Sequence, residues 1–68
     1  MNKFAERLKE VRLDAGKNRA SLARELNVSE RLISYWENGK RECDFDTLLH
    51  LANIFNVSVD YLLGKTDY

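Results

Sequence analysis

The sequence predicts an all-α fold of five helices, and three observations predict it. Its 68 residues include three glycines and no proline, so few positions interrupt a helix. Apolar residues recur three and four positions apart, which is the spacing of one face of a helix. Residues that favour helix ends stand between these apolar runs. A chain of this length is expected to form one domain, residues 1–68.

The first predicted helix covers residues 3–15. Its inward face holds four apolar side chains at helical spacing, namely Phe4, Leu8, Val11 and Ala15. Asn2 is placed to cap the start of this helix. Gly16 is placed to close it in the left-handed conformation, which glycine adopts readily.

The second and third predicted helices are joined by a short turn. The second covers residues 19–26, behind the cap residue Asn18, and ends at Asn27, a residue type that tolerates the left-handed conformation. The third begins after Ser29, whose hydroxyl can accept from the first free backbone amides. It ends near residue 38, where an Asn-Gly pair supplies a turn.

The fourth predicted helix covers residues 45–55, behind the cap Asp44. Its inward stripe is expected to contain five apolar residues: Phe45, Leu48, Leu49, Ala52 and Phe55. A short fifth helix covers residues 59–63 and lies between Ser58 and Gly64.

The charges cancel in number, eleven of each sign, but they are unevenly distributed. Residues 1–41 carry ten basic and six acidic side chains, hence a net charge of +4. Residues 42–68 carry one basic and five acidic side chains, hence −4. A basic front would attract a polyanion such as a nucleic acid. The same pattern equally fits charges that only solvate a small protein.

Several function classes are disfavoured by what the chain lacks. No apolar run approaches the roughly 18 residues that span a bilayer, and residues 1–10 do not resemble a signal peptide. Cys43 is the only cysteine, which excludes an intrachain disulfide and a thiolate zinc cluster. Cys43 and His50 supply too few groups for a metal site or a nucleophile with its base. We therefore expect a soluble cytoplasmic protein that is not an enzyme and binds no metal or cofactor.

The third predicted helix has two chemically different faces. Leu32, Ile33 and Trp36 share one face at the spacing that packs on a core. The opposite face carries hydrogen-bonding side chains that can address the edges of bases: Glu30, Arg31, Ser34, Tyr35 and Asn38. An ordinary solvated helix face has a similar composition, so the surrounding spacing decides between the two interpretations.

That spacing is typical of a helix-turn-helix over about residues 19–38. Two helices that cross closely need a small residue at the contact, and Ala23 stands there. The turn residue Asn27 follows four positions later, and the apolar Ile33 six positions after that. A tight turn at this spacing sets the second helix at a steep angle to the first.

The chain resembles the Cro/repressor-type (XRE-like) helix-turn-helix domains of phage repressors and bacterial regulators. The resemblance extends from about Phe4 to Gly64, and its most specific piece is WENGKR, at residues 36–41. The other pieces are RLKEVR (7–12), SLARELNVS (21–29), ISY (33–35) and DTLLHLANIFNVSVDYLLG (46–64). It implies a compact five-helix, lambda-repressor-like domain with the third helix in the major groove of DNA. It also implies a transcriptional regulator, a Cro-like protein or repressor, that binds a palindromic operator as a homodimer.

The resemblance also implies roles for individual residues. The candidates for reading bases are Glu30, Arg31, Ser34 and Tyr35. The candidates for contacting phosphates are Arg19, Ser29, Asn38, Lys40 and Arg41. Lys17-Asn18-Arg19 stands where the family usually has Leu-Ser/Thr-Gln, which changes the contact geometry expected at Arg19. An alternative role for Glu30 is purely structural, because an acidic side chain is favoured near the N-terminus of a helix.

Two further expectations concern internal and intermolecular contacts. A bare carboxylate at Glu37 would repel phosphates, so we expect an ion pair with Arg12, which the resemblance supports. A homodimer contact is expected at the fifth helix and the tail: Tyr61, Leu62, Leu63 and Tyr68. Leu62 fits the core equally well. The alternative function is a protein-interaction module that uses its acidic rear, and an antirepressor or other partner protein is a further candidate partner.

Overall fold

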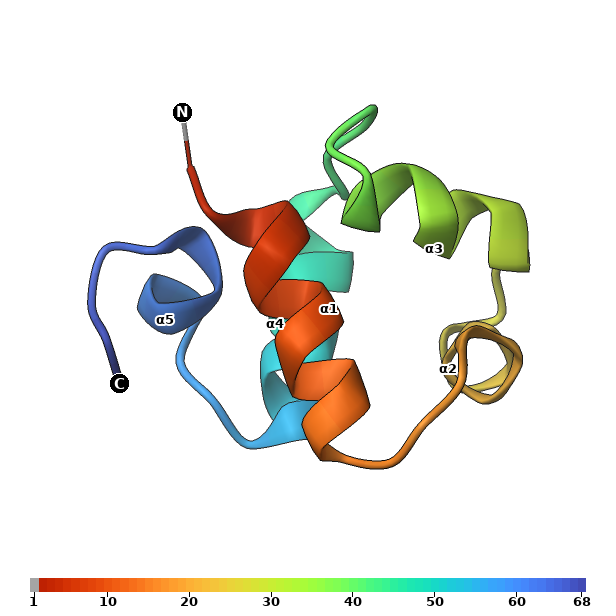
Figure 1. The fold of residues 1–68 in the computed structure, drawn as a ribbon, viewed down its shortest axis with the longest axis horizontal. Coiled ribbons are helices and arrows are strands. Elements are labelled where there is room, and N and C mark those ends of the chain that lie inside the picture. The colour runs from red at the N-terminus through yellow and green to blue at the C-terminus, as the bar shows by residue number, and fades with distance from the viewer. Residues whose placement is uncertain (1) are drawn as a thin grey trace.

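A computed structural model describes residues 2–68 and confirms the predicted fold class. Within those residues it contains five helices and no strand (Figure 1). The helices are α1 (Phe4–Asp14), α2 (Arg19–Leu26), α3 (Glu30–Glu37), α4 (Phe45–Phe55) and α5 (Val59–Leu63). Each predicted helix end is correct to within one residue.

Local side-chain hydrogen bonds set where the helices begin. Four side chains each accept a hydrogen bond from the backbone N–H three residues later, at Asn18, Ser29, Asp44 and Ser58. A cap of this kind contributes about 1 kcal/mol, because it satisfies a donor that has no partner within the helix. At α1 the cap position is Lys3, whose side chain makes no cap hydrogen bond, and Asn2 before it accepts from the backbone N–H of Phe4 at 3.0 Å. Asn27 and Asn56 end α2 and α4 in the left-handed conformation, with φ of 57° and 54°.

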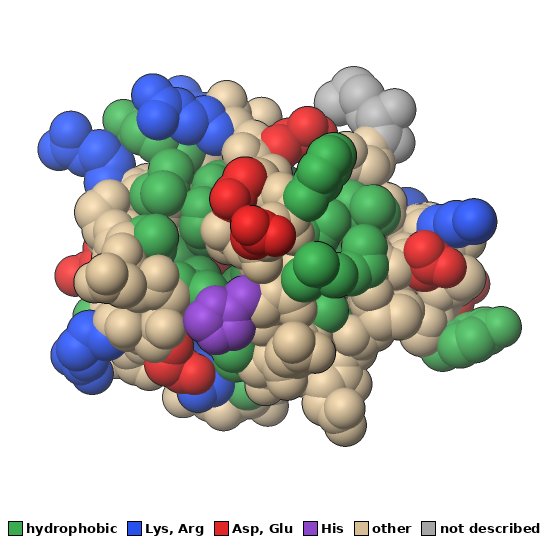
Figure 2. Space-filling view, turned by 180° about the vertical axis from the view of Figure 1, so that it is seen from behind, with side chains coloured by type: hydrophobic (Ala, Val, Ile, Leu, Met, Phe, Trp, Pro, Cys, Tyr) green, Lys and Arg blue, Asp and Glu red, His purple; other side chains and the backbone are tan. Residues whose placement is uncertain are grey.

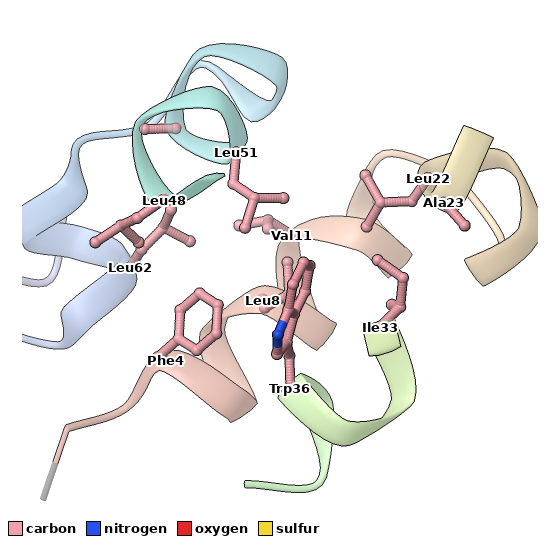
Figure 3. Close-up of a cluster of buried hydrophobic side chains, with 11 residues drawn as sticks. Phe4, Leu8, Val11, Leu22, Ala23, Ile33, Trp36, Leu48, Leu51 and Leu62 are labelled. Atoms are coloured by element: carbon pink, nitrogen blue, oxygen red, sulfur yellow. The ribbon is translucent and has the colours of Figure 1, made fainter. Parts of the chain in front are cut away.

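The core takes side chains from all five helices (Figure 3). Each helix contributes one side chain that is completely buried: Leu8, Leu22, Ile33, Leu51 and Leu62. Burying a side chain of this size stabilises the fold by about 1.5–3 kcal/mol. Ala23 is buried in the same cluster, on the helix that packs against α3, as its predicted place at the helix crossing requires.

The predicted inward faces of α1 and α4 are wrong in part. Phe45 and Leu49 were expected to be buried, but they are 84% and 56% exposed, and Leu51 is buried instead. At 100° per residue, Leu51 lies beside Leu48 on the side away from Leu49, so the buried stripe is turned toward Leu51. Ala15 is exposed because α1 ends at the preceding residue.

Arg7 lies on the apolar face of α1 and is buried, although no pattern in the sequence indicates a buried charge there. Its guanidinium group donates to the backbone carbonyls of Tyr61 and Thr66, at 3.0 and 3.1 Å, and contacts Asp67 at 3.3 Å. The same group lies over the ring of Tyr61, 4.2 Å from its centre. Arg7 therefore ties α5 and the following residues to α1.

The two sides of the molecule are formed by different helices. The pair α2 and α3 lies on one side, α5 and the C-terminus lie on the opposite side, and α1 lies between them (Figure 1). α1 packs against both α3 and α5. The outer flank of α3 is therefore not covered by α5 or by the residues that follow it.

Candidate nucleic-acid interface

α3 has one buried flank and one accessible flank. Ile33 is completely buried and Trp36 is 3% exposed, so both belong to the core. Glu30 and Arg31 are exposed on the other flank. Ser34 and Tyr35 are half-buried, so this flank is less open than a simple helical wheel predicts. The short helix is thus held by its apolar flank and presents an arginine and a carboxylate at its first turn.

The chain after α3 folds back over Tyr35. The backbone N–H groups of Lys40 and Arg41 both donate to the carbonyl of Tyr35, at 2.9 and 3.4 Å. This turn places the guanidinium group of Arg41 over the ring of Tyr35, 5.0 Å from its centre. Such cation–π contacts contribute about 0.5–1 kcal/mol at exposed sites. Arg41 and Tyr35 also line one shallow hollow with Ser29, Arg31 and Leu32.

The other predicted contact residues around this flank differ in whether their side chains already form hydrogen bonds within the protein. The hydroxyl oxygen of Ser29 accepts from the backbone N–H of Leu32 at 3.1 Å. The amide nitrogen of Asn38 donates to the hydroxyl of Ser34 at 3.3 Å. Lys40 is exposed.

A three-membered charge cluster joins α1, α2 and α3. The side chain of Glu37 is completely buried. Its carboxylate accepts two hydrogen bonds from Arg12, from Nε at 2.6 Å and from Nη2 at 3.0 Å. It accepts a third from Nε of Arg19 at 3.2 Å. Arg12 also donates to the carbonyl of Lys17 at 3.0 Å, so the cluster holds the loop between α1 and α2 as well.

Comparison with known proteins decides the family. The sequence model of a family described as Helix-turn-helix matches residues 8–62 of the chain. The chain belongs to this helix-turn-helix family. The matched region contains α2, α3 and α4 completely, together with most of α1 and α5. We refer to α2, α3 and the turn between them as the helix-turn-helix unit.

Relatives of this helix-turn-helix chain include proteins named as regulators. The HTH-type transcriptional regulator ImmR of Bacillus subtilis is 47% identical over 64 residues, which are 94% of this chain and 50% of the relative. The chain spans about half the length of the curated relatives it matches.

Two solved structures have the same fold. A transcriptional regulator from Listeria innocua superposes with a TM-score of 0.89 and 33% identity, over 94% of this chain and 60% of that one. The DNA-binding domain of the P22 c2 repressor superposes with a TM-score of 0.81 and 34% identity, over 93% of this chain and 86% of that one.

The helix-turn-helix unit carries most of the predicted site residues. We also searched the described residues for a metal site, a membrane-spanning helix and a reactive thiol. Among residues 2–68, no three His, Cys, Asp or Glu side chains lie close enough together to hold a metal ion. None of the described helices is long and apolar enough to cross a membrane. Burial, followed by the negative charge of Asp44, raises the pKa of the Cys43 thiol to about 11. A thiol with this pKa is protonated at neutral pH and is a poor nucleophile.

Two contacts in the helix-turn-helix unit were not anticipated from sequence. Arg41 is predicted to meet the DNA backbone, and no pattern in the sequence indicates that it also stacks on Tyr35. Arg19 was expected at a phosphate, and its bond to Glu37 was not expected. An arginine just inside a helix N-terminus, where the family usually has glutamine, was the available signal for an unusual contact.

Proposed function

We propose that this helix-turn-helix chain is a sequence-specific, double-stranded DNA-binding transcriptional regulator of the Cro or repressor type, with residues 1–68 forming its DNA-binding domain. The observation that carries the proposal is the two-sided geometry of α3. Ile33 and Trp36 fix one flank in the core, while Arg31 points to solvent beside the stacked pair Tyr35 and Arg41. A helix of this kind fits the major groove and can present side chains to base edges.

Each surface residue has a chemical role in this proposal. Arg31 pairs with guanine, and Glu30 accepts from the amino group of cytosine. Ser34 and Tyr35 are further base-reading candidates. The residues proposed to contact phosphates are Arg19, Ser29, Asn38, Lys40 and Arg41. These contacts fix the orientation of α3 in the groove and do not read the sequence.

The proposal includes a homodimer on a palindromic operator. One small module buries little DNA surface, and a twofold pair reads two half-sites about 34 Å apart. Leu62 is completely buried and belongs to the core, so only Tyr61, Leu63 and Tyr68 of the predicted contact remain available. Tyr68 is 89% exposed, and Leu63 lines the same hollow as the exposed Phe45.

The apolar surface near this contact is interspersed with acids. Seen from behind, over α4, the molecule presents hydrophobic side chains between Asp and Glu side chains (Figure 2). On α4 itself, Phe45 and Leu49 are exposed, and the exposed acids Glu42, Asp44 and Asp46 lie just before the helix or in its first turn. This surface also supports a second candidate function, a protein-interaction module that meets a partner protein or an antirepressor.

We place the protein in the cytoplasm, where a bacterial operator is found.

Selection of bound sites from a random DNA pool, followed by gel-shift titration, tests the proposal. We expect one preferred sequence with twofold symmetry, and an affinity that falls with salt at a log–log slope of about −0.9 per neutralised phosphate. Arg31→Ala should weaken binding by about 1–3 kcal/mol and relax the preference at one base position.

The matched control is Lys65→Ala, which removes the same charge beyond α5, on the opposite side of the molecule. It should leave the base preference unchanged. A loss that is uniform over all sequences would show that Arg31 does not read bases. No binding even at low salt would favour the protein-interaction module.

A further inference from the structure

The charge cluster of Arg12, Arg19 and Glu37 has a net charge of +1. One carboxylate faces two guanidinium groups, those of Arg12 and Arg19. Arg12 uses both carboxylate oxygens and is itself buried, so the pair of Arg12 and Glu37 is neutral and complete. The unbalanced charge therefore belongs to Arg19, whose side chain is 39% exposed.

The bond from Arg19 to Glu37 restrains the arginine without occupying its terminal amino groups. The donor is Nε, and within residues 2–68 neither terminal nitrogen of Arg19 hydrogen-bonds to another residue. A planar guanidinium group held at Nε keeps its outer fork in one direction. Such a fork matches the geometry of a phosphate, which accepts two parallel hydrogen bonds.

The position of Arg19 suits a contact with a DNA backbone. It is the first residue of α2, directly after the capping residue Asn18. The positive end of a helix dipole lies there, which favours an anion. Glu37 is the last residue of α3, so the contact holds the start of α2 beside the end of the proposed reading helix.

We propose that Glu37 is a positioning residue for DNA binding: it holds Arg19 by Nε so that the two terminal amino groups of Arg19 face one DNA phosphate. The inference rests on the proposed function, because it needs DNA as the ligand. It differs from a purely structural role, in which Glu37 serves Arg12 alone and Arg19 contacts the phosphate as a freely moving cation. The two accounts predict different coupling between Arg19 and Glu37 in DNA affinity.

A double-mutant cycle measures this coupling. The affinity for the selected operator is determined at one salt concentration for the wild type, Arg19→Met, Glu37→Gln and the double variant. In the wild-type background we expect Arg19→Met to weaken binding roughly tenfold, which is typical of a hydrogen-bonded charge. In the Glu37→Gln background the same change should weaken binding by less than about threefold, because no carboxylate then holds Arg19 by Nε with its terminal amino groups toward the phosphate.

Lys40→Met supplies the matched control. Lys40 is also a proposed phosphate contact and has the same charge, but the ion pairs of Glu37 are with Arg12 and Arg19 and not with Lys40. Its effect should therefore be the same in both backgrounds. If the effect of Arg19→Met is also the same in both backgrounds, Glu37 does not position Arg19 and the inference is overturned.

A conservative variant keeps the inference testable if Glu37→Gln does not fold, which circular dichroism reports. Arg19→Lys retains the charge but has no Nε and no fork, so it should lose most of the tenfold factor while the salt slope of binding is unchanged. Wild-type affinity of Arg19→Lys would overturn the positioning role. If the wild-type protein binds no DNA in the same assay, the proposed function itself fails, and the two failures are thereby distinguished.

Discussion

Removal of the Glu37 carboxylate should destabilise the fold severely. In Glu37→Ala, the guanidinium group of Arg12 remains buried, with 6% of the residue exposed, and among residues 2–68 it keeps one acceptor, the carbonyl of Lys17. Breaking a buried pair by removing one partner costs about 3–5 kcal/mol. A chain of 68 residues has a total stability of roughly 3–10 kcal/mol. The expected loss is therefore a large part of the whole.

Thermal melting followed by circular dichroism at low protein concentration measures this loss. For a domain of this size, each kcal/mol lowers Tm by about 4–8 °C, so a loss of about 3 kcal/mol corresponds to roughly 12–24 °C. The control is Glu10→Ala, which removes an exposed acid from α1 and should change stability by less than about 0.5 kcal/mol. A Glu37→Ala variant that melts within about 3 °C of the wild type would refute the reasoning.

Three further predictions follow from burial and backbone geometry. The raised pKa of Cys43 predicts that alkylation by iodoacetamide accelerates up to about pH 11 in the folded protein but levels off near 9.0 in urea. Because the folded state holds this thiol proton more tightly than the unfolded state, the contribution of the thiol to stability is present below pH 9.0 and is lost as the pH rises toward 11. Alkylation rates that level off at the same pH in the folded protein and in urea would contradict the raised pKa. Gly64→Ala should lower Tm, because φ is +84° and the added Cβ would lie 2.7 Å from Cγ of Lys3, and an unchanged Tm would disagree. Tyr68→Ser should weaken the proposed dimer in sedimentation equilibrium without lowering Tm, since Tyr68 is 89% exposed; an unchanged dimer would exclude the side chain of Tyr68 from the contact.

The helix boundaries were predictable because their signals are local. Asn18, Ser29 and Ser58 each cap a helix through a backbone amide only three residues away, so a short stretch of sequence contains the whole interaction. The buried places of Ile33 and Trp36 on α3 followed from their spacing alone. The division of α3 into a core flank and an outer flank was therefore available before the structure.

The remaining features depend on contacts between distant parts of the chain. Arg7 is buried because it meets the carbonyl of Tyr61, 54 residues later, and no pattern around Arg7 indicates that partner. The rotation of α4 that exposes Phe45 depends on how the other helices pack against it. The stacking of Arg41 on Tyr35 depends on the turn between them. Spacing within one helix contains none of this information.

The buried charges in the cluster are poorly explained by stability alone. Well-packed apolar residues often replace a buried ion pair without loss, so Arg12→Met combined with Glu37→Met should fold with nearly wild-type stability. This double variant leaves the net charge of the chain unchanged, so its long-range attraction to DNA is also unchanged.

Apolar side chains cannot, however, accept the hydrogen bond from Nε of Arg19. The folded double variant should therefore bind the selected operator about three- to tenfold more weakly, which gel-shift titration at fixed salt measures. Wild-type affinity in the folded double variant would mean that Arg19 reaches the phosphate without Glu37, and that the charges serve another purpose. Weaker binding with an intact fold would show that the same carboxylate that is buried in the core also organises the surface that meets DNA.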